Sequence, residues 1–141
     1  MKTKLNDAII LAADKHRGQV DKGGSPYILH PLRVMQKAKR DEERIVAVLH
    51  DVVEDTDVTL DELRVMGFDE RIVTAIDHLT RRGGETYNDF ILRVKQNELA
   101  TRVKLLDIED NSDLSRLQEV TEQDENRLRR YQKAVELLAD R

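Results

Sequence analysis

The sequence predicts an all-α fold. Only two prolines and six glycines interrupt its 141 residues, and the composition is rich in Leu, Ala, Glu, Lys and Arg, which are good helix formers. Apolar residues recur at intervals of three and four, and no stretch shows the two-residue alternation of a half-buried strand. We therefore expect a helical bundle of about eight short helices, forming a single domain over residues 1–141.

The first predicted helix covers residues 4–17, because Leu5 and Ile9 begin an apolar series at helical spacing. A glycine-rich loop follows and ends near Pro26. Pro31 suits the first position of a second helix that runs to about residue 39, since a proline there loses no hydrogen bond.

A strongly apolar run from Ile45 to Leu49 indicates a third helix over residues 41–53. Thr59 followed by Glu62 forms a capping box for a short fourth helix, which Gly67 ends. The remaining predicted helices cover about residues 69–79, 86–95, 98–112 and 122–139.

Composition excludes several classes of protein. The net charge is −4, which argues against binding a nucleic acid polymer but leaves room for a small phosphorylated ligand. The absence of cysteine excludes disulfides, a thiolate zinc site and a cysteine nucleophile. No apolar run approaches a membrane span, and no secretory signal is recognisable at the start. We expect a cytoplasmic, soluble protein whose oligomeric state the sequence leaves open.

Two polar residues follow the most apolar helix directly. His50 and Asp51 come immediately after Leu49, and a buried charge must be paired or bound to a metal. Imidazole nitrogen and carboxylate oxygen make a suitable metal pair. The plainer interpretation is a helix end with solvated charges, and the doublet alone does not separate the two.

A second polar position lies in the predicted helix 98–112. Val103, Asp107 and Asn111 share one stripe, so Asp107 is expected to face the core. There it would bind a metal, cap a neighbouring helix or pair with an Arg. His30 stands at a helix start, where a capping or core histidine is the plainer interpretation. Taken together, His30, His50, Asp51 and Asp107 would make a mixed nitrogen and oxygen set suited to Mn²⁺, Fe²⁺, Zn²⁺ or Co²⁺.

These residues resemble a known family. The chain resembles the HD-domain metal-dependent phosphohydrolases, and within them the hydrolase domain of the RelA/SpoT enzymes, which degrade the alarmone ppGpp. The similarity covers about residues 5–135. The motifs that carry it are His16-Arg17-Gly18-Gln19, Lys22, Pro26-Tyr27-Ile28, His30-Pro31, His50-Asp51, Glu54-Asp55-Thr56 and Lys104-Leu105-Leu106-Asp107 through Asn111.

The resemblance implies roles for individual residues. His30, His50, Asp51 and Asp107 would bind the metal, usually Mn²⁺ in this branch, although another divalent ion would also fit. Glu54 and Asp55 would serve the attacking water. Lys22 would contact phosphate and Asn111 would hold the nucleotide. There is no room in 141 residues for the synthetase and regulatory domains of the long enzymes, so pyrophosphate transfer from ATP is not expected.

A phosphorylated substrate needs further cations. Arg17 and Lys104 are candidates, as is the pair Arg81-Arg82, for which solvated loop charges are the plainer interpretation. His16 lies on an apolar face and is expected to be buried behind the site. His78 has no partner motif and is expected to be structural.

Two departures from the RelA/SpoT pattern concern the substrate. Asp21 stands where that branch usually has an Arg that stacks on guanine, and Asp110 stands where it tends to have His. The predicted activity is removal of the 3′-pyrophosphate of (p)ppGpp. The alternatives are an HD-type phosphatase acting on another nucleotide, such as NADPH or a nucleoside monophosphate, and an inactive nucleotide-binding module.

Overall fold

The computed structural model describes residues 4–139, and most of this range is helical. Nine α-helices and one short 3₁₀ helix occur in it, and the only strand-type pairing among these residues is an isolated bridge between Val20 and Pro26. The helices are α1 (Leu5–Lys15), α2 (Leu29–Lys37), α3 (Asp41–Leu49), α4 (Val52–Asp55), α5 (Leu60–Val65), α6 (Glu70–Leu79), α7 (Tyr87–Lys95), α8 (Glu98–Asn111), η1 (Leu114–Arg116) and α9 (Glu122–Ala139). The predicted all-α class is confirmed.

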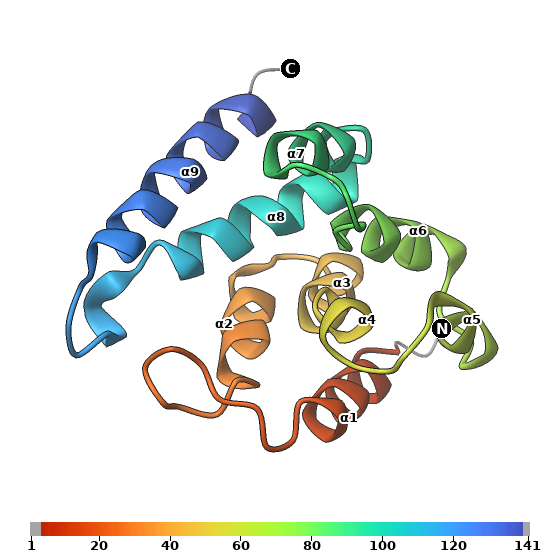
Figure 1. Ribbon diagram of the computed structural model, residues 1–141. Coiled ribbons are helices and arrows are strands. Elements are labelled where there is room, and N and C mark those ends of the chain that lie inside the picture. The colour runs from red at the N-terminus through yellow and green to blue at the C-terminus, as the bar shows by residue number, and fades with distance from the viewer. Residues whose placement is uncertain (1–3, 140–141) are drawn as a thin grey trace.

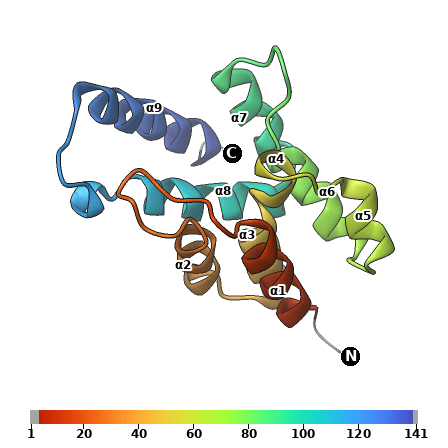
Figure 2. The same cartoon turned by 60° about the horizontal axis from the view of Figure 1, so that its bottom comes forward.

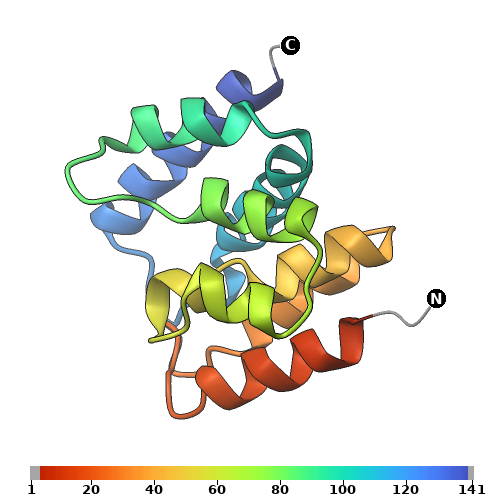
Figure 3. The same cartoon turned by 90° about the vertical axis from the view of Figure 1, so that its right-hand side faces the viewer.

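Helix α3 is the centre of the molecule (Figure 1). It packs against α1, α2, α6 and α8, and the five residues from Ile45 to Leu49 are all buried. Helix α9 packs on α7 and α8 and lies on the outside of this group, as Figures 1 and 2 show. Seen from the side, α1 and α7 lie at opposite ends of the molecule (Figure 3).

Side-chain caps begin the helices where the sequence contains short polar residues. Thr59 Oγ1 accepts a hydrogen bond from the Glu62 N–H at 3.1 Å, which confirms the predicted start of α5. Asn97 Oδ1 accepts one from the Ala100 N–H at 2.8 Å at the start of α8. These oxygens satisfy N–H groups that have no partner inside the helix.

Two predicted helix boundaries are wrong. Helix α2 begins at Leu29, two residues before Pro31, because turn hydrogen bonds start the helix earlier. Pro31 remains within the first turn, where no N–H is needed. The predicted helix 41–53 is two helices, since α3 ends at Leu49 and α4 begins at Val52. This break lies at His50-Asp51 and matters for the site.

Candidate metal centre and adjoining pocket

Three segments bring the predicted metal ligands together. His30 lies in the first turn of α2, His50 and Asp51 join α3 to α4, and Asp107 lies in α8. Asp107 Oδ1 is 2.8 Å from His30 Nε2 and 3.1 Å from His50 Nε2. One ligand atom from each of these three buried residues lies within 4.8 Å of the other two. The structure therefore groups them as a possible metal site.

Asp51 completes the set because the helix breaks beside it. Its Oδ2 lies 3.1 Å from His50 Nε2 and 3.8 Å from His30 Nε2. Adjacent residues do not face each other in a continuous helix. The turn between α3 and α4 allows the side chains of His50 and Asp51 to converge on one point.

The second nitrogen of each histidine has a partner of its own. His50 Nδ1 is 2.5 Å from the Ala47 carbonyl oxygen, which can only accept, so Nδ1 carries the proton. His30 Nδ1 is 2.6 Å from Asp110 Oδ2. Both Nε2 atoms therefore face the carboxylates, and each would offer its lone pair to an ion bound between them. Two imidazole nitrogens and two carboxylate oxygens fit a divalent cation of the Mn²⁺ to Zn²⁺ series.

The charges of the cluster shift its pKa values. Burial acts to lower the pKa of His50, but the carboxylates of Asp51 and Asp107 raise it well above its ordinary value. Burial acts to raise the pKa of Asp107, yet the charges of Lys104 and His50 hold it well below its usual range. The cluster thus concentrates negative charge where a cation would lie.

Each carboxylate also has hydrogen-bond partners other than the histidines. Lys104 Nζ lies 2.8 Å from Asp107 Oδ2, and Asn111 Nδ2 donates to Asp107 Oδ1 at 3.2 Å. The Tyr27 hydroxyl donates to Asp51 Oδ2. Lys104 therefore points inward to Asp107, and it is not among the residues that line the pocket described below.

Glu54 and Asp55 lie on α4, one turn beyond Asp51. Both side chains are exposed, and Glu54 Oε1 accepts a hydrogen bond from the Arg81 N–H at 2.8 Å. Partial burial, together with the charges of Asp51 and Glu54, raises the pKa of Asp55 to about 6. Asp55 is thus a carboxyl group able to exchange a proton near neutral pH.

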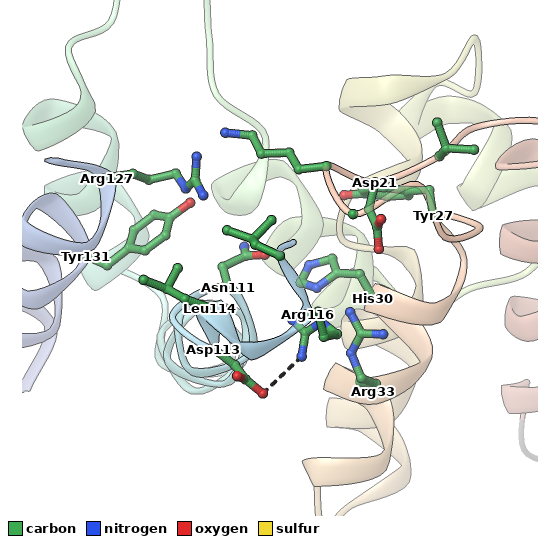
Figure 4. Close-up of a pocket in the computed structure, with 14 residues that line it drawn as sticks. Asp21, Tyr27, His30, Arg33, Asn111, Asp113, Leu114, Arg116, Arg127 and Tyr131 are labelled. Carbon is green, nitrogen blue, oxygen red and sulfur yellow. Dashed lines mark hydrogen bonds and ion pairs between the residues drawn. The ribbon is translucent and has the colours of Figure 1, made fainter. Parts of the chain in front are cut away.

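A pocket of about 280 Å³ adjoins the cluster through His30. Arg127 and Tyr131 of α9 lie on one side of it, and Asp21 and Tyr27 lie opposite (Figure 4). The lining residues are Val20, Asp21, Lys22, Gly23, Tyr27, His30, Arg33, Asn111, Asp113, Leu114, Arg116, Leu117, Arg127 and Tyr131.

Four cations line this pocket, and three of them are paired. Arg33 lies 2.8 Å from Asp110, Arg116 lies 3.1 Å from Asp113, and Arg127 lies 2.9 Å from Asp124. No hydrogen bond or ion pair joins Lys22 to another of residues 4–139. Lys22 is therefore the cation most available to a phosphate.

Arg17 does not reach this pocket. It is exposed at the end of α1, 3.5 Å from Asp14, and it lines a separate hollow with Ile10 and Met66. Arg81 and Arg82 are exposed in the loop after α6. His16 is buried against the Tyr27 ring, as expected, and His78 is half-buried with Nδ1 2.9 Å from the Thr74 carbonyl oxygen.

Asp21 shapes the loop that carries Lys22. Its Oδ1 accepts a hydrogen bond from the Ser25 N–H at 2.9 Å, and its own N–H donates to the Ser25 carbonyl at 2.8 Å. The carboxylate at the position of the expected guanine-stacking Arg is therefore partly occupied in closing its own loop.

Several site residues carried no usable signal in the sequence. Arg116 reaches the pocket from a segment between two predicted helices, and Tyr131 from a segment for which only helicity is predicted. Asp110 departs from the RelA/SpoT pattern, but the sequence does not predict its contact with His30, because the two residues are 80 positions apart. The one signal in the sequence is the spacing of three residues between Asp107 and Asp110, which puts both on the same side of a helix.

Comparison with known protein families identifies the family of this chain. The family model described as HD domain matches residues 8–137, and the chain belongs to the HD domain family. Its His50-Asp51 doublet lies at the centre of the cluster. HD domains are metal-dependent, and the residues grouped here supply a candidate site.

Curated relatives are longer proteins. The chain is 35% identical over 120 residues to the guanosine-3′,5′-bis(diphosphate) 3′-pyrophosphohydrolase of Aquifex aeolicus, over 77% of this chain and 17% of that protein. It is 31% identical over 119 residues to the bifunctional (p)ppGpp synthase/hydrolase SpoT of Escherichia coli, over 74% of this chain and 17% of that protein. The chain thus spans about a sixth of their length.

A solved structure shares the fold. It is described as a metazoan ortholog of SpoT that hydrolyzes ppGpp and plays a role in starvation responses. The TM-score is 0.77 at 24% identity, and the match covers 96% of this chain and 84% of the other. The arrangement of helices found here is therefore one already known for an HD-type fold.

Proposed function

We propose that the protein is a metal-dependent phosphohydrolase that removes the 3′-pyrophosphate of (p)ppGpp. The observation that carries this proposal is the position of His30, which belongs both to the His/Asp cluster and to the lining of the cation-rich pocket. A nucleotide in the pocket would place a phosphate beside the cluster. The names of the curated relatives point to the same reaction.

His30, His50, Asp51 and Asp107 would hold the metal, with Mn²⁺ as the preferred ion. A divalent ion at such a site lowers the pKa of bound water and polarises a phosphate oxygen. Asp107 would keep its orientation through Lys104 and Asn111, and Asp51 through Tyr27. Asp107 Oδ1 and Asp51 Oδ2, the oxygens that lie nearest the histidines, would face the ion.

Glu54 and Asp55 would accept the proton of the attacking water or orient that water. Their place one turn beyond Asp51 keeps them beside the cluster, and the raised pKa of Asp55 suits a group that accepts and then returns a proton. Lys22 would bind the phosphates as the unpaired cation of the pocket, and Asn111 would contact the nucleotide from α8. A binding module without turnover would have no use for the Glu54-Asp55 pair.

One observation favours a second candidate, a phosphatase acting on another phosphorylated nucleotide. Asp21 supplies a carboxylate where a guanine-stacking cation is expected, and its oxygen already accepts from Ser25. A carboxylate offers no stacking cation to a purine face. Weak discrimination among bases is the consequence, so NADPH or a nucleoside monophosphate remains the alternative substrate.

The enzyme would act in the cytoplasm as a single HD hydrolase domain over residues 1–141, of which residues 1–3 and 140–141 lie outside the described range. No helix within residues 4–139 combines the length and the apolar character that a membrane crossing requires. The partner would be a free nucleotide and not a nucleic acid polymer, in keeping with the net charge of −4.

The test is a screen of the purified protein with Mn²⁺ against phosphorylated nucleotides, measuring released phosphate and pyrophosphate. The expected result is pyrophosphate from ppGpp, lost in His50→Ala together with bound metal, because each ligand is one of four. Release of phosphate alone from another nucleotide would favour the second candidate. Metal retained in full by a His50→Ala, Asp51→Ala double variant would contradict the assigned ligands.

A further inference from the structure

The imidazole of His30 lies between two carboxylates of one helix. Asp107 Oδ1 is 2.8 Å from its Nε2, and Asp110 Oδ2 is 2.6 Å from its Nδ1. The two acids are three residues apart on α8, so a single turn of that helix holds both nitrogens of the ring. Asp110 is 2% exposed and touches no other member of the His/Asp cluster in the contacts observed.

The two histidines of the cluster are held differently. His50 donates from Nδ1 to a neutral backbone carbonyl, that of Ala47, whereas His30 has a carboxylate behind it. An ionised carboxylate cannot donate a hydrogen bond, so it requires the proton to reside on His30 Nδ1. An ion that replaced the hydrogen bond between Nε2 and Asp107 Oδ1 would then meet the Nε2 lone pair.

We propose that Asp110 is a positioning residue that fixes the tautomer and the orientation of His30 so that Nε2 can bind the metal. This inference rests on the proposed metal site and adds a residue that does not touch the ion. A carboxylate behind a ligating histidine also makes the ring a stronger donor, and losing such a partner typically weakens metal binding about 10–100-fold.

Cations hold Asp110 in this position. Arg33 Nε donates to its Oδ1 at 2.8 Å, leaving Oδ2 for His30. Arg116 Nη2 donates to the Asp110 backbone carbonyl at 2.9 Å, and Lys37 Nζ lies 3.8 Å from Oδ1. These contacts from α2 and η1 balance the buried charge, which would otherwise be strongly unfavourable.

The informative variant is Asp110→Asn. Arg33 can only donate, so it selects the amide oxygen and turns the amide NH₂ toward His30. Nδ1 must then accept, and the proton moves to Nε2, where it blocks the metal. We expect the Kd for Mn²⁺, measured by competition with a fluorescent chelator, to rise about 10–100-fold.

Glu43→Gln is the matched control. Glu43 is also a buried carboxylate, and it lies 2.8 Å from Nε of Arg102 on α8, but it makes no contact with His30 and does not line the pocket. Its replacement tests whether the loss of any buried, paired carboxylate near α8 suffices. We expect the Kd for Mn²⁺ to stay within about twofold of wild type.

A second measurement does not depend on the folding of a variant. In the wild-type protein loaded with Zn²⁺, ¹⁵N-histidine NMR should show a hydrogen-bonded, downfield proton on His30 Nδ1. Its absence, or equal Mn²⁺ affinity in Asp110→Asn and wild type, would overturn this inference alone. Failure of the wild-type protein to bind any divalent ion would overturn the proposed metal site as well.

Discussion

Asp107 illustrates how much depends on single side chains in this site. One of its oxygens faces both histidines and the other faces Lys104. Removing either histidine would leave a buried carboxylate with fewer partners, which is costly in a protein interior. At the scale of residues, a change to one proposed metal ligand therefore also disturbs the side chains that contact it. Catalytic roles must be tested at residues outside this cluster.

Glu54 and Asp55 are such positions. Glu54→Gln and Asp55→Asn preserve size and hydrogen bonding but remove the group that accepts a proton. We expect metal to remain bound while kcat falls about 10²–10⁴-fold in at least one variant, the usual contribution of a general base. The measurement is steady-state hydrolysis beside metal content. If both variants turned over at the wild-type rate, water activation would need no side-chain base.

We predict that Asp21 weakens base recognition in the proposed pocket. Asp21→Arg should lower the KM for ppGpp with little change in kcat, because stacking acts equally in the ground state and the transition state. Asp21→Asn is the control, since it can still accept from the Ser25 N–H but offers no cation. A wild-type preference for guanine over adenine above about tenfold, or about 1.4 kcal/mol, would mean that another residue reads the base.

At the scale of elements, the loop before α2 lies close to η1 at Gly23. A Cβ on Gly23 would lie 3.0 Å from the Arg116 carbonyl oxygen, closer than side chains normally approach backbone. Gly23→Ala should push this loop and Lys22 away from the pocket. We expect KM to rise about five- to tenfold, equal to roughly 1 kcal/mol of binding, with kcat changed less.

Gly83→Ala provides the comparison for that loop. Gly83 lacks a positive φ, and a Cβ at this position would have no neighbouring atom within 4 Å. Its KM should remain at the wild-type value. Equal KM values in the two alanine variants would show that contact between the loop and η1 does not position the substrate.

The loop between α6 and α7 depends on an ion pair. Arg93 Nε lies 2.8 Å from Glu85, and Arg93 Nη2 also donates to the Thr80 carbonyl oxygen at 2.8 Å. The hydrogen bond from Arg93, together with that from the Arg82 N–H, lowers the pKa of Glu85 from 4.5 to about 2. This pairing connects the end of α6 to α7 and supports the segment that carries Arg81.

A lowered carboxyl pKa predicts the sign of a pH effect. Stability from Glu85 should be fully present above about pH 4.5 and lost as the pH falls toward 2, because the unfolded chain takes up the proton first. Urea unfolding of Glu85→Gln should therefore differ from wild type at pH 6 and converge with it near pH 2–3. Glu119→Gln, which removes the same charge at an exposed position, is the control. A difference that grew on acidification would contradict the assignment.

At the scale of the whole molecule, the proposed ligands come from α2, the α3–α4 junction and α8. An ion that binds only the folded state stabilises it by about 2.7 kcal/mol when present at 100 times its Kd. For a chain of this size the thermal midpoint should rise by roughly 8–10 °C. Calorimetry with Mn²⁺ and with chelator measures the change.

His50→Ala is the control for that linkage. Its midpoint should no longer respond to Mn²⁺, since one of the four ligands is gone. A wild-type midpoint independent of Mn²⁺ concentration would contradict metal binding at this site. The same response in His50→Ala and wild type would place the ion elsewhere.

The sequence by itself determined the fold class and predicted which residues form the candidate metal site. Sparse glycine and proline, together with apolar residues at intervals of three and four, predicted helices. The apolar run before His50 predicted a buried helix, and the burial of Ile45 to Leu49 confirms it. The stripe through Asp107 predicted correctly that this carboxylate faces inward. Such features are local, because periodicity records which face of a helix is buried.

Only the tertiary structure decided what each buried polar group meets. The sequence pattern did not predict the break between α3 and α4 or the contact of Asp110 with His30. It also did not predict that Lys104 points inward or that Arg17 lies away from the pocket. Residues 30 and 110 are 80 positions apart and meet because α2 packs on α8. Helical spacing carries no record of such pairings, since they arise from how separate helices pack.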